Sequence, residues 1–148
     1  MLSFPHMTPL FLASDHAGFE LKESIKALLR KQRVTVMDLT LKKISGDDYP
    51  AIGRALASRV AHTRGRGILF CGSGVGVAIA ANRVRGARAV EGCATKQVKL
   101  AREHNDVNIL TLGGRSTSLA LAKTLVKTFL ATSASTAARH KRRVKQLG

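Results

Sequence analysis

The chain is poor in aromatic residues, in cysteine and in long apolar runs. It has no tryptophan and one tyrosine, and aromatic residues make up only 4% of its 148 positions. So few rings cannot form the stacking platform on which single-stranded nucleic acid is usually bound. The two cysteines include no Cys-x-x-Cys pair, which excludes a disulfide scaffold and a zinc ribbon and favours a reducing compartment.

Apolar runs stay far below the roughly 20 residues that a membrane helix needs, so we expect no membrane-spanning segment. The first thirteen residues also lack the basic segment of a secretory signal. Together with the scarcity of cysteine, these features lead us to expect a cytoplasmic protein.

Acidic residues are scarce as well. Nine aspartates and glutamates are outnumbered by 25 lysines and arginines, which gives a formal net charge of +16. Such a charge is compatible with nucleic acid, an anionic surface or small anionic substrates as partners. The basic residues are spread over nearly every predicted helix, and the one dense cluster is RHKRR at 139–143. This spread and the lack of aromatic residues argue against a nucleic-acid partner.

Short apolar runs alternate with helical patterns along the chain. Five runs have the length and composition of buried strands, at 9–14, 34–39, 67–70, 87–90 and 107–112. Between them, apolar residues recur at helical spacing, as in Leu21, Ile25 and Leu28. This alternation predicts an α/β fold of the Rossmann-like, doubly wound type, with a five-stranded parallel sheet and helices on both faces. We expect one domain over 1–148, ending in a basic helix over 136–147.

In such folds, ligands bind at the carboxyl ends of the strands, which directs attention to four strand-to-helix junctions. These junctions are at 15–18, 71–76, 91–95 and 113–116. The second follows an apolar strand with three alternating glycines and a helix of small residues, whose backbone N–H groups can converge on an anion. Val77 stands where a dinucleotide-binding loop needs glycine, and no Gly-Lys-Ser/Thr follows as in a P-loop.

Cys71 ends the third predicted strand beside these N–H groups, where a thiolate is stabilised and can act as a base. The alternative is a small buried residue that only packs, and we assign such a structural role to Cys93. Asp15 and His16 follow the first strand at the same edge, although Asp15 could simply cap the next helix. His104 closes a helix, where it could be a structural cap or a general acid–base group.

Three arginines are candidates for binding a phosphate. Arg139 and Arg143 are four residues apart and share one helical face, which suits their two guanidinium groups to a phosphate dianion. A solvated basic tail is the alternative for this pair. Arg115 follows two glycines after the fifth strand and is therefore expected at the ligand edge.

Four segments together resemble one known family. They are SDHAGFELKESIK at 14–26, DDYP at 47–50, GILFCGSGVGVAIAANRVRGARAV at 67–90 and LAREHNDVNILTLGGR at 100–115. In order and spacing they are similar to the type B ribose-5-phosphate isomerases, a family that includes the galactose-6-phosphate isomerase subunits. The resemblance implies a Rossmann-like fold, a homodimer or a tetramer with active sites at the subunit interface, and neither a metal nor an organic cofactor.

The resemblance also implies roles for the catalytic residues. Cys71 matches the base that moves a proton between C1 and C2 of a sugar phosphate through a cis-enediolate. Ser73 matches part of the family's anion hole, and Gly72, Gly74, Val75 and Gly76 match the rest of it. His104 matches the histidine that opens the furanose ring, and Asn105 matches its neighbour, which contacts the reacting oxygens.

The remaining matched positions contact the substrate. Asp15, which we group with the catalytic residues, and Tyr49 match positions that contact the sugar. The family's phosphate-contacting positions are matched by His16, Arg115, Arg139 and Arg143. The implied reaction interconverts ribose 5-phosphate and ribulose 5-phosphate. The alternatives are the same reaction on a six-carbon substrate, such as allose 6-phosphate or galactose 6-phosphate, and a non-catalytic protein that binds sugar phosphate or nucleic acid.

Overall fold

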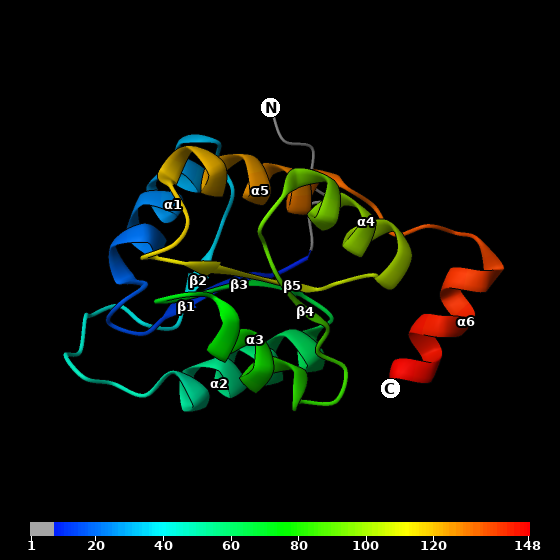
Figure 1. Cartoon of the computed structure of the whole chain (residues 1–148), viewed down its shortest axis with the longest axis horizontal. Coiled ribbons are helices and arrows are strands. Elements are labelled where there is room, and N and C mark those ends of the chain that lie inside the picture. Colours follow the sequence, from blue (N-terminus) through cyan, green and yellow to red (C-terminus); the bar gives the residue numbers. More distant parts are fainter. Residues whose placement is uncertain (1–7) are drawn as a thin grey trace.

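The structure, a computed structural model, describes residues 8–148, so the predicted domain start at residue 1 lies outside the described residues. Its centre is one sheet of five parallel strands in the order β2-β1-β3-β5-β4. The strands are β1 Leu10–Ser14, β2 Met37–Asp38, β3 Arg66–Cys71, β4 Ala89–Glu91 and β5 Ile109–Gly113. Figure 1 shows this sheet between two layers of helices. The predicted five-stranded parallel α/β fold is confirmed.

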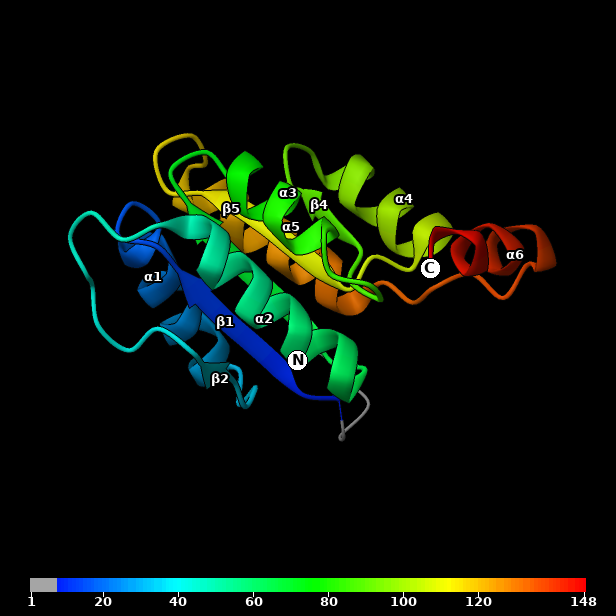
Figure 2. The same cartoon turned by 90° about the horizontal axis from the view of Figure 1, so that it is seen from below.

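Six helices of the described chain surround the sheet. One face is covered by α1 Phe19–Lys31, α4 Thr95–Asn105 and α5 Leu119–Ala131, and the other by α2 Tyr49–Thr63 and α3 Val75–Asn82 (Figure 1). The last helix, α6 Ala138–Leu147, lies outside both layers and packs beside the end of α4 (Figures 1 and 2). Among residues 8–148, no helix is long and apolar enough to cross a membrane.

The strands supply side chains to both faces of the sheet, and this alternation builds two cores. Leu12 and Phe70 pack with α1, α4 and α5, whereas Phe11 and Leu69 pack with α2 and α3. Each such fully buried side chain contributes roughly 1.5–3 kcal/mol of transfer free energy. Because the strands are buried on both sides, they appear in the sequence as continuous apolar runs.

The edge strand β2 departs most from the prediction. A strand was expected over 34–39, but only two residues pair with β1. Val34 still packs against the core, so the apolar pattern marks burial rather than backbone pairing. Asp38, the last residue of β2, accepts hydrogen bonds at Oδ2 from Lys22 and Lys26 of α1, at 2.7 and 2.6 Å. These ion pairs hold the end of β2 against α1.

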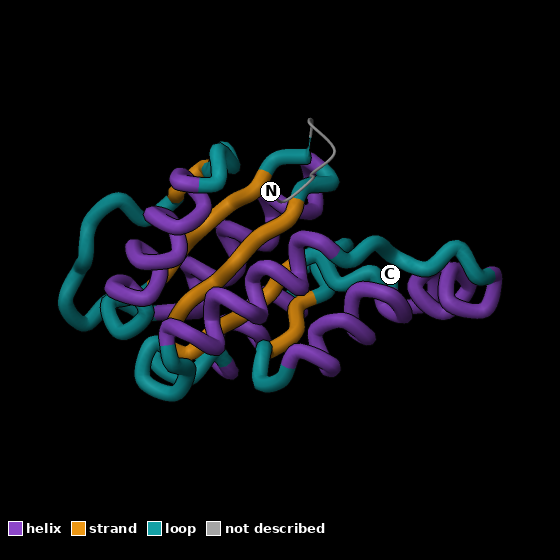
Figure 3. Tube along the Cα trace, turned by 90° about the horizontal axis from the view of Figure 1, so that it is seen from above, coloured by secondary structure: helices purple, strands orange, loops and turns teal. Residues whose placement is uncertain are grey.

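The register of the strands brings several loops to one edge of the sheet. Ser14 pairs with Phe70, and Cys71 pairs with Gly113, so β1, β3 and β5 end side by side. The chain continues from β1 to β2 on one side and then to β3 on the other, which makes this the switch point of the sheet. Figure 3 follows the strands to this edge, where loops lead into the helices. The crevice outside β1 and β3 is the expected ligand site.

Candidate active site

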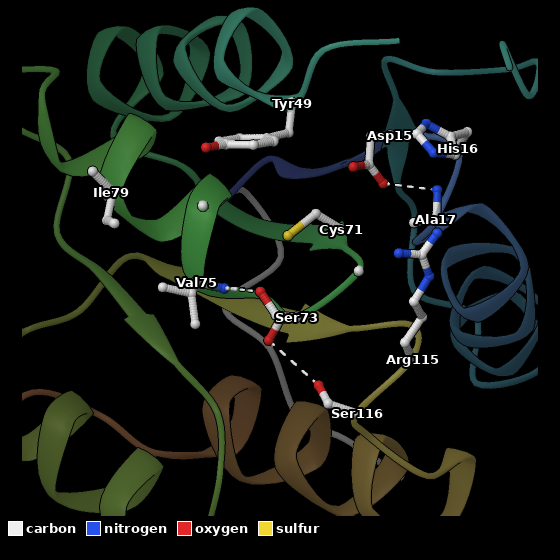
Figure 4. A pocket seen from close by; sticks show the side chains of 12 residues that line it. Asp15, His16, Ala17, Tyr49, Cys71, Ser73, Val75, Ile79, Arg115 and Ser116 are labelled. Atoms are coloured by element: carbon white, nitrogen blue, oxygen red, sulfur yellow. Dashed lines mark hydrogen bonds between the residues drawn. The ribbon is translucent and has the colours of Figure 1, made fainter. Parts of the chain in front are cut away.

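A hollow of about 590 Å³ opens at this edge, over the ends of β1 and β3 (Figure 4). Four segments line it: the turn after β1, the start of α2, the loop after β3 and the turn after β5. The predicted site residues in its lining are Asp15, His16, Tyr49, Cys71, Gly72, Ser73, Val75, Gly76 and Arg115. One chain thus gathers most of the predicted site in one place.

Cys71 forms the floor of the hollow. It is the last residue of β3 and only 4% exposed, and its side chain packs in the core under α2 and α3. Its Sγ accepts a hydrogen bond from the backbone N–H of Gly74 at 3.1 Å. A donor of this kind suits a thiolate, because negative charge on the acceptor strengthens the hydrogen bond. The following loop therefore sets both the position and the environment of the sulfur.

The glycine loop after β3 is held by contacts with β5. Gly74 has a φ of +84°, which glycine adopts without strain, and a Cβ there would lie 3.0 Å from the Leu112 carbonyl carbon. Thr111 Oγ1 donates a hydrogen bond to the Gly74 carbonyl at 2.7 Å, and the N–H of Gly114 donates to the Cys71 carbonyl at 2.7 Å. The loop thus leads into the N-terminus of α3, where backbone N–H groups can stabilise an oxyanion.

Tyr49 closes the hollow on the side of α2. It is the first residue of that helix and is 41% exposed, and its ring extends over the hollow (Figure 4) and lies against Gly76. A Cβ on Gly76 would lie 2.6 Å from this ring, so a larger residue there would have to displace the tyrosine. The ring therefore borders the space above Cys71.

Asp15 is buried at the end of β1. Its Oδ1 accepts hydrogen bonds from the N–H groups of Ala17 and Gly18, at 2.9 and 3.0 Å. The N-cap residue of α1 is Gly18, so Asp15 closes the turn before the helix rather than occupying the cap position. Its carboxylate also lines the hollow (Figure 4), which leaves it able to contact a ligand.

His16 is held by an aspartate that has no local sequence signal. Asp47 Oδ1 accepts hydrogen bonds from both the backbone N–H and Nδ1 of His16, each at 2.8 Å. Nδ1 therefore carries a proton in this arrangement, and Nε2 remains for a ligand. Asp47 is 31 residues from His16 along the chain, and it begins the DDYP segment at 47–50, which runs into the first residues of α2.

Arg115 and Ser116 line the hollow from the turn after β5. The backbone N–H of Arg115 donates to the Gly72 carbonyl at 2.9 Å and ties the two loops together. Its guanidinium lies beside the same glycine, since a Cβ on Gly72 would be 3.5 Å from Nη1. Ser116, which was not predicted, donates from Oγ to the Ser73 carbonyl at 3.4 Å. Arg115 thus offers a positive charge near His16 (Figure 4).

Five predicted residues are absent from the lining: Gly74 lies within the glycine loop, and the other four lie elsewhere. His104 and Asn105 form the last turn of α4, Arg139 and Arg143 are on α6, and none of them lines the hollow above Cys71. α4 runs back from the carboxyl end of β4 toward the start of β5, so its last turn lies at the opposite edge of the sheet (Figure 2). A single chain does not bring these residues to the hollow.

A stacked pair of histidines joins α6 to α4. The rings of His104 and His140 are parallel within 7°, and their centroids are 4.3 Å apart. Burial, together with His104, Arg139 and Arg143, lowers the pKa of His140 from its usual 6.5, so this ring is neutral near pH 7. The stack fixes α6, and with it both arginines, beside the end of α4.

The junction after β4 does not take part in the hollow. Residues 91–95 were one of the four expected ligand junctions, but none of them lines it. Cys93, which was expected to be structural, is exposed and belongs to neither core, because it follows an edge strand. Burial and Glu91 raise the pKa of its thiol. Residues 8–148 contain no group of three or more histidine, cysteine or carboxylate side chains suited to a metal ion.

Comparison with known proteins extends these observations to the whole chain. The family described as Ribose/Galactose Isomerase matches residues 10–147, a range that contains both the Cys71 hollow and the end of α4 with α6. The chain belongs to the ribose/galactose isomerase family. The family predicted from the four sequence segments is therefore confirmed.

Members of the ribose/galactose isomerase family are similar to this chain along most of their length. Ribose-5-phosphate isomerase B of Mycolicibacterium paratuberculosis is 42% identical over 137 residues, which cover 91% of this chain and 86% of that protein. A ribose 5-phosphate isomerase structure from Thermotoga maritima has a TM-score of 0.90 and 39% identity, covering 96% of this chain and 98% of that one. Ribose-5-phosphate isomerase B from Mycoplasma genitalium, solved with bound ribulose-5-phosphate, has a TM-score of 0.88 and 35% identity, covering 95% and 93%.

Proposed function

We propose that this chain is an aldose–ketose isomerase that interconverts ribose 5-phosphate and ribulose 5-phosphate. The observation that carries the proposal is the Cys71 thiol, which lies at the floor of a hollow and accepts a hydrogen bond from the glycine loop. Membership of the ribose/galactose isomerase family supports this type of reaction, and a relative of the same fold binds ribulose-5-phosphate.

The reaction needs a base that carries one proton between neighbouring carbons. From the open-chain aldose, the Cys71 thiolate removes the proton on C2, and the electron pair forms the C1–C2 double bond of a cis-enediolate whose charge rests on O1. Return of this proton to C1, with transfer of the O2 proton to O1, gives the ketose. We assign the oxyanion to the Ser73 hydroxyl and to backbone N–H groups of the loop from Gly72 to Gly76. Within that loop, the N–H of Gly74 already donates to Cys71 Sγ and that of Val75 to Ser73 Oγ. Asp15 and Tyr49 border the sugar hydroxyls.

Binding of the phosphate holds the flexible open-chain sugar in a reactive geometry, because remote binding energy offsets the cost of ordering it. His16 and Arg115 provide this contact at the edge of the hollow. Arg139 and Arg143 lie on α6, away from the hollow of their own chain. In the assembled enzyme, these two arginines of a second copy complete the phosphate site. His104 opens the furanose ring from that same copy, and Asn105 contacts the reacting oxygens.

We infer that each complete site forms between two chains of a homodimer. His104 lies at the opposite edge of its own sheet from Cys71, so it can reach a Cys71 hollow only from another copy. Val75 and Ile79 on α3, and Leu100 on α4, are exposed by 43%, 56% and 37%, and a second hollow of about 610 Å³ runs beside α4. Exposed apolar residues of this kind suit helix packing between subunits related by a two-fold axis.

We also propose that the protein works in the cytoplasm. Neither Cys71 nor Cys93 is in a disulfide. The Cys71 thiol has to stay reduced in order to act as a base, and a reducing compartment meets this condition.

The deciding test is turnover of ribose 5-phosphate by the wild type, Cys71→Ala and Cys93→Ala, with a chelator in every assay. We expect Cys71→Ala to lower kcat by roughly 10²–10⁴-fold, the usual contribution of a positioned base. Cys93→Ala should match the wild type, because its exposed side chain lies outside the hollow. Equal turnover by all three proteins would exclude Cys71 as the base.

Allose 6-phosphate and galactose 6-phosphate, assayed alongside, distinguish the length of the sugar. If either hexose phosphate is turned over faster than ribose 5-phosphate, that hexose phosphate becomes the proposed substrate. Binding of sugar phosphates without turnover of any of them would indicate a non-catalytic binding protein.

A further inference from the structure

A second, strongly basic cavity lies at the opposite edge of the sheet from Cys71. Its volume is about 430 Å³, and it is bordered by the ends of α2 and α4 and by residues that precede or begin β1, β3, β4 and β5. Four arginines line it: Arg64, Arg66, Arg88 and Arg102. Within residues 8–148, the one carboxylate in its lining is Asp106. The cavity therefore has an excess of three positive charges.

Asp106 is already shared between two of these arginines. Its Oδ2 accepts a hydrogen bond from Arg88 Nη2 at 3.2 Å, and its Oδ1 accepts one from Arg102 Nη1 at 2.9 Å. The other hydrogen bonds of these guanidinium groups are to backbone carbonyls, such as Asn105 for Arg88 and Thr132 for Arg102. One carboxylate cannot neutralise both of them and also serve the other two arginines.

Arg64 and Arg66 make no ion pair with any acidic side chain of the part that the structure describes. Arg66 Nη1 donates to the carbonyls of Phe129 and Leu130, at 3.3 and 2.9 Å. Arg64 ends α2 and is exposed. Burial and the charge of nearby Arg102 lower the pKa of Arg66 to about 10. Carbonyl oxygens offset only part of the positive charge on the partly buried Arg66. Neither arginine has a counter-ion of its own among the described side chains.

We propose that this cavity is a second anion site, which binds a phosphate group independently of the Cys71 hollow. Guanidinium forks match the oxygen geometry of phosphate, and a dianion offsets most of the excess charge. Thr8 adds a hydroxyl to the lining. The volume admits inorganic phosphate or a small phosphorylated metabolite. Part of the formal charge of +16, which isomerisation does not require, has a role at this site.

The test is calorimetric titration of inorganic phosphate into the full chain and into Arg64→Gly/Arg66→Gln. Glycine suits the φ of 54° at Arg64, and glutamine keeps an N–H donor for the carbonyls that Arg66 contacts. The matched control is Arg33→Gly/Arg30→Gln, which also removes two charges and also replaces an arginine with positive φ, 59°, after α1.

We expect the wild type and the control to bind two phosphates per chain, one in the Cys71 hollow and one in the basic cavity. The Arg64→Gly/Arg66→Gln variant should lose one of them or bind it at least about tenfold more weakly. Its turnover of ribose 5-phosphate should be unchanged, since neither arginine lines the Cys71 hollow. Equal phosphate binding by the two double variants would overturn the proposal, whatever reaction the chain catalyses.

Two further measurements complete this test. The single variants Arg64→Gly and Arg33→Gly repeat the comparison without disturbing the contacts of Arg66. Arg64→Gly should weaken phosphate binding at the basic cavity by a smaller factor than the double variant does. AMP is titrated in parallel. Tighter binding of AMP than of phosphate at the Arg64-dependent site would assign it to a nucleotide, whereas tighter binding of phosphate would assign it to the free ion.

Discussion

The two halves of the proposed active site are built in different ways. The half around Cys71 comes from four segments of one chain, and hydrogen bonds between its loops fix its geometry. The half around His104 consists of the end of α4 and of α6, joined by a stacked histidine pair at the opposite edge of the sheet. In this proposal, the base is positioned within one subunit, whereas ring opening and part of the phosphate contact depend on assembly.

Mixing two defective variants tests this division with the largest expected effect. Cys71→Ala damages the first half, and a chain with His104→Ala, Arg139→Gln and Arg143→Gln damages the second. When the two are refolded together, about half of the dimers are mixed, and each mixed dimer has one intact site. Turnover of ribose 5-phosphate should therefore rise from near zero to about a quarter of the wild-type value.

The control for this experiment mixes Cys71→Ala with Ser73→Ala. Both residues belong to the half around Cys71, at the end of β3 and in the loop that follows it, so every site in a mixed dimer keeps one defect and no recovery is expected. Recovery in both mixtures, or in neither, would contradict a site shared between subunits.

Within the Cys71 half, Gly74→Ala should lower kcat/KM by about 10²-fold, since a misplacement of about 1 Å can have that effect. The new Cβ would lie 3.0 Å from the Leu112 carbonyl carbon, and the φ of +84° is strained for alanine. The shift moves the N–H group that donates to Cys71. Steady-state kinetics measures the loss of activity, and thermal unfolding measures the loss of stability from backbone strain.

Gly46→Ala is the matched control for that substitution. Gly46 also has a positive φ, +72°, but nothing lies within 4 Å of its would-be Cβ. The variant should therefore lose about 1–2 kcal/mol of stability from backbone strain and keep its turnover. Equal losses of turnover in the two variants would show that strain, and not the loop contact, matters.

The Cys71 half was also the easier half to predict. An apolar run followed by alternating glycines and small residues indicates a strand, a turn and a helix from neighbouring positions alone. Cys71 does end β3, and the loop does lead into α3. His104 and Arg143 could be assigned to helices, but no local pattern tells which hollow the end of a helix meets in an assembly.

Features that depend on distant partners could not be predicted from the sequence. Lys22 is fully buried on α1, because Asp38, sixteen residues away, accepts hydrogen bonds from it, whereas a helical lysine is normally expected at the surface. The pairing of Asp47 with His16 is of the same kind. The strand expected over 34–39 pairs at only two residues, since an edge strand has one neighbour and its apolar residues can pack without it.

The smallest predicted effect concerns the contact between α4 and α6. Burial, together with His104, Arg139 and Arg143, holds the pKa of His140 below its usual 6.5. The unfolded chain therefore binds more protons than the folded chain near that pH, so the docking of α6 is most stable above pH 6.5 and weakens as the pH falls. Hydrogen exchange, corrected for intrinsic rates, should show a few-fold loss of protection in α6 between about pH 7.5 and about pH 5.5.

A His140→Phe variant separates proton uptake from packing in this contact. Phenylalanine can stack on His104 but takes up no proton, so its α6 should be equally protected at both pH values. An unchanged pH response in the variant would assign the titration to a group other than His140. Protection in the loop after β3 should stay constant over the same range, because its contacts with β5 and the following turn involve backbone and hydroxyl groups that do not titrate there. A parallel loss of protection in that loop would mean that the Cys71 half and the His104 half open as one unit. The two halves would then not be independent in stability.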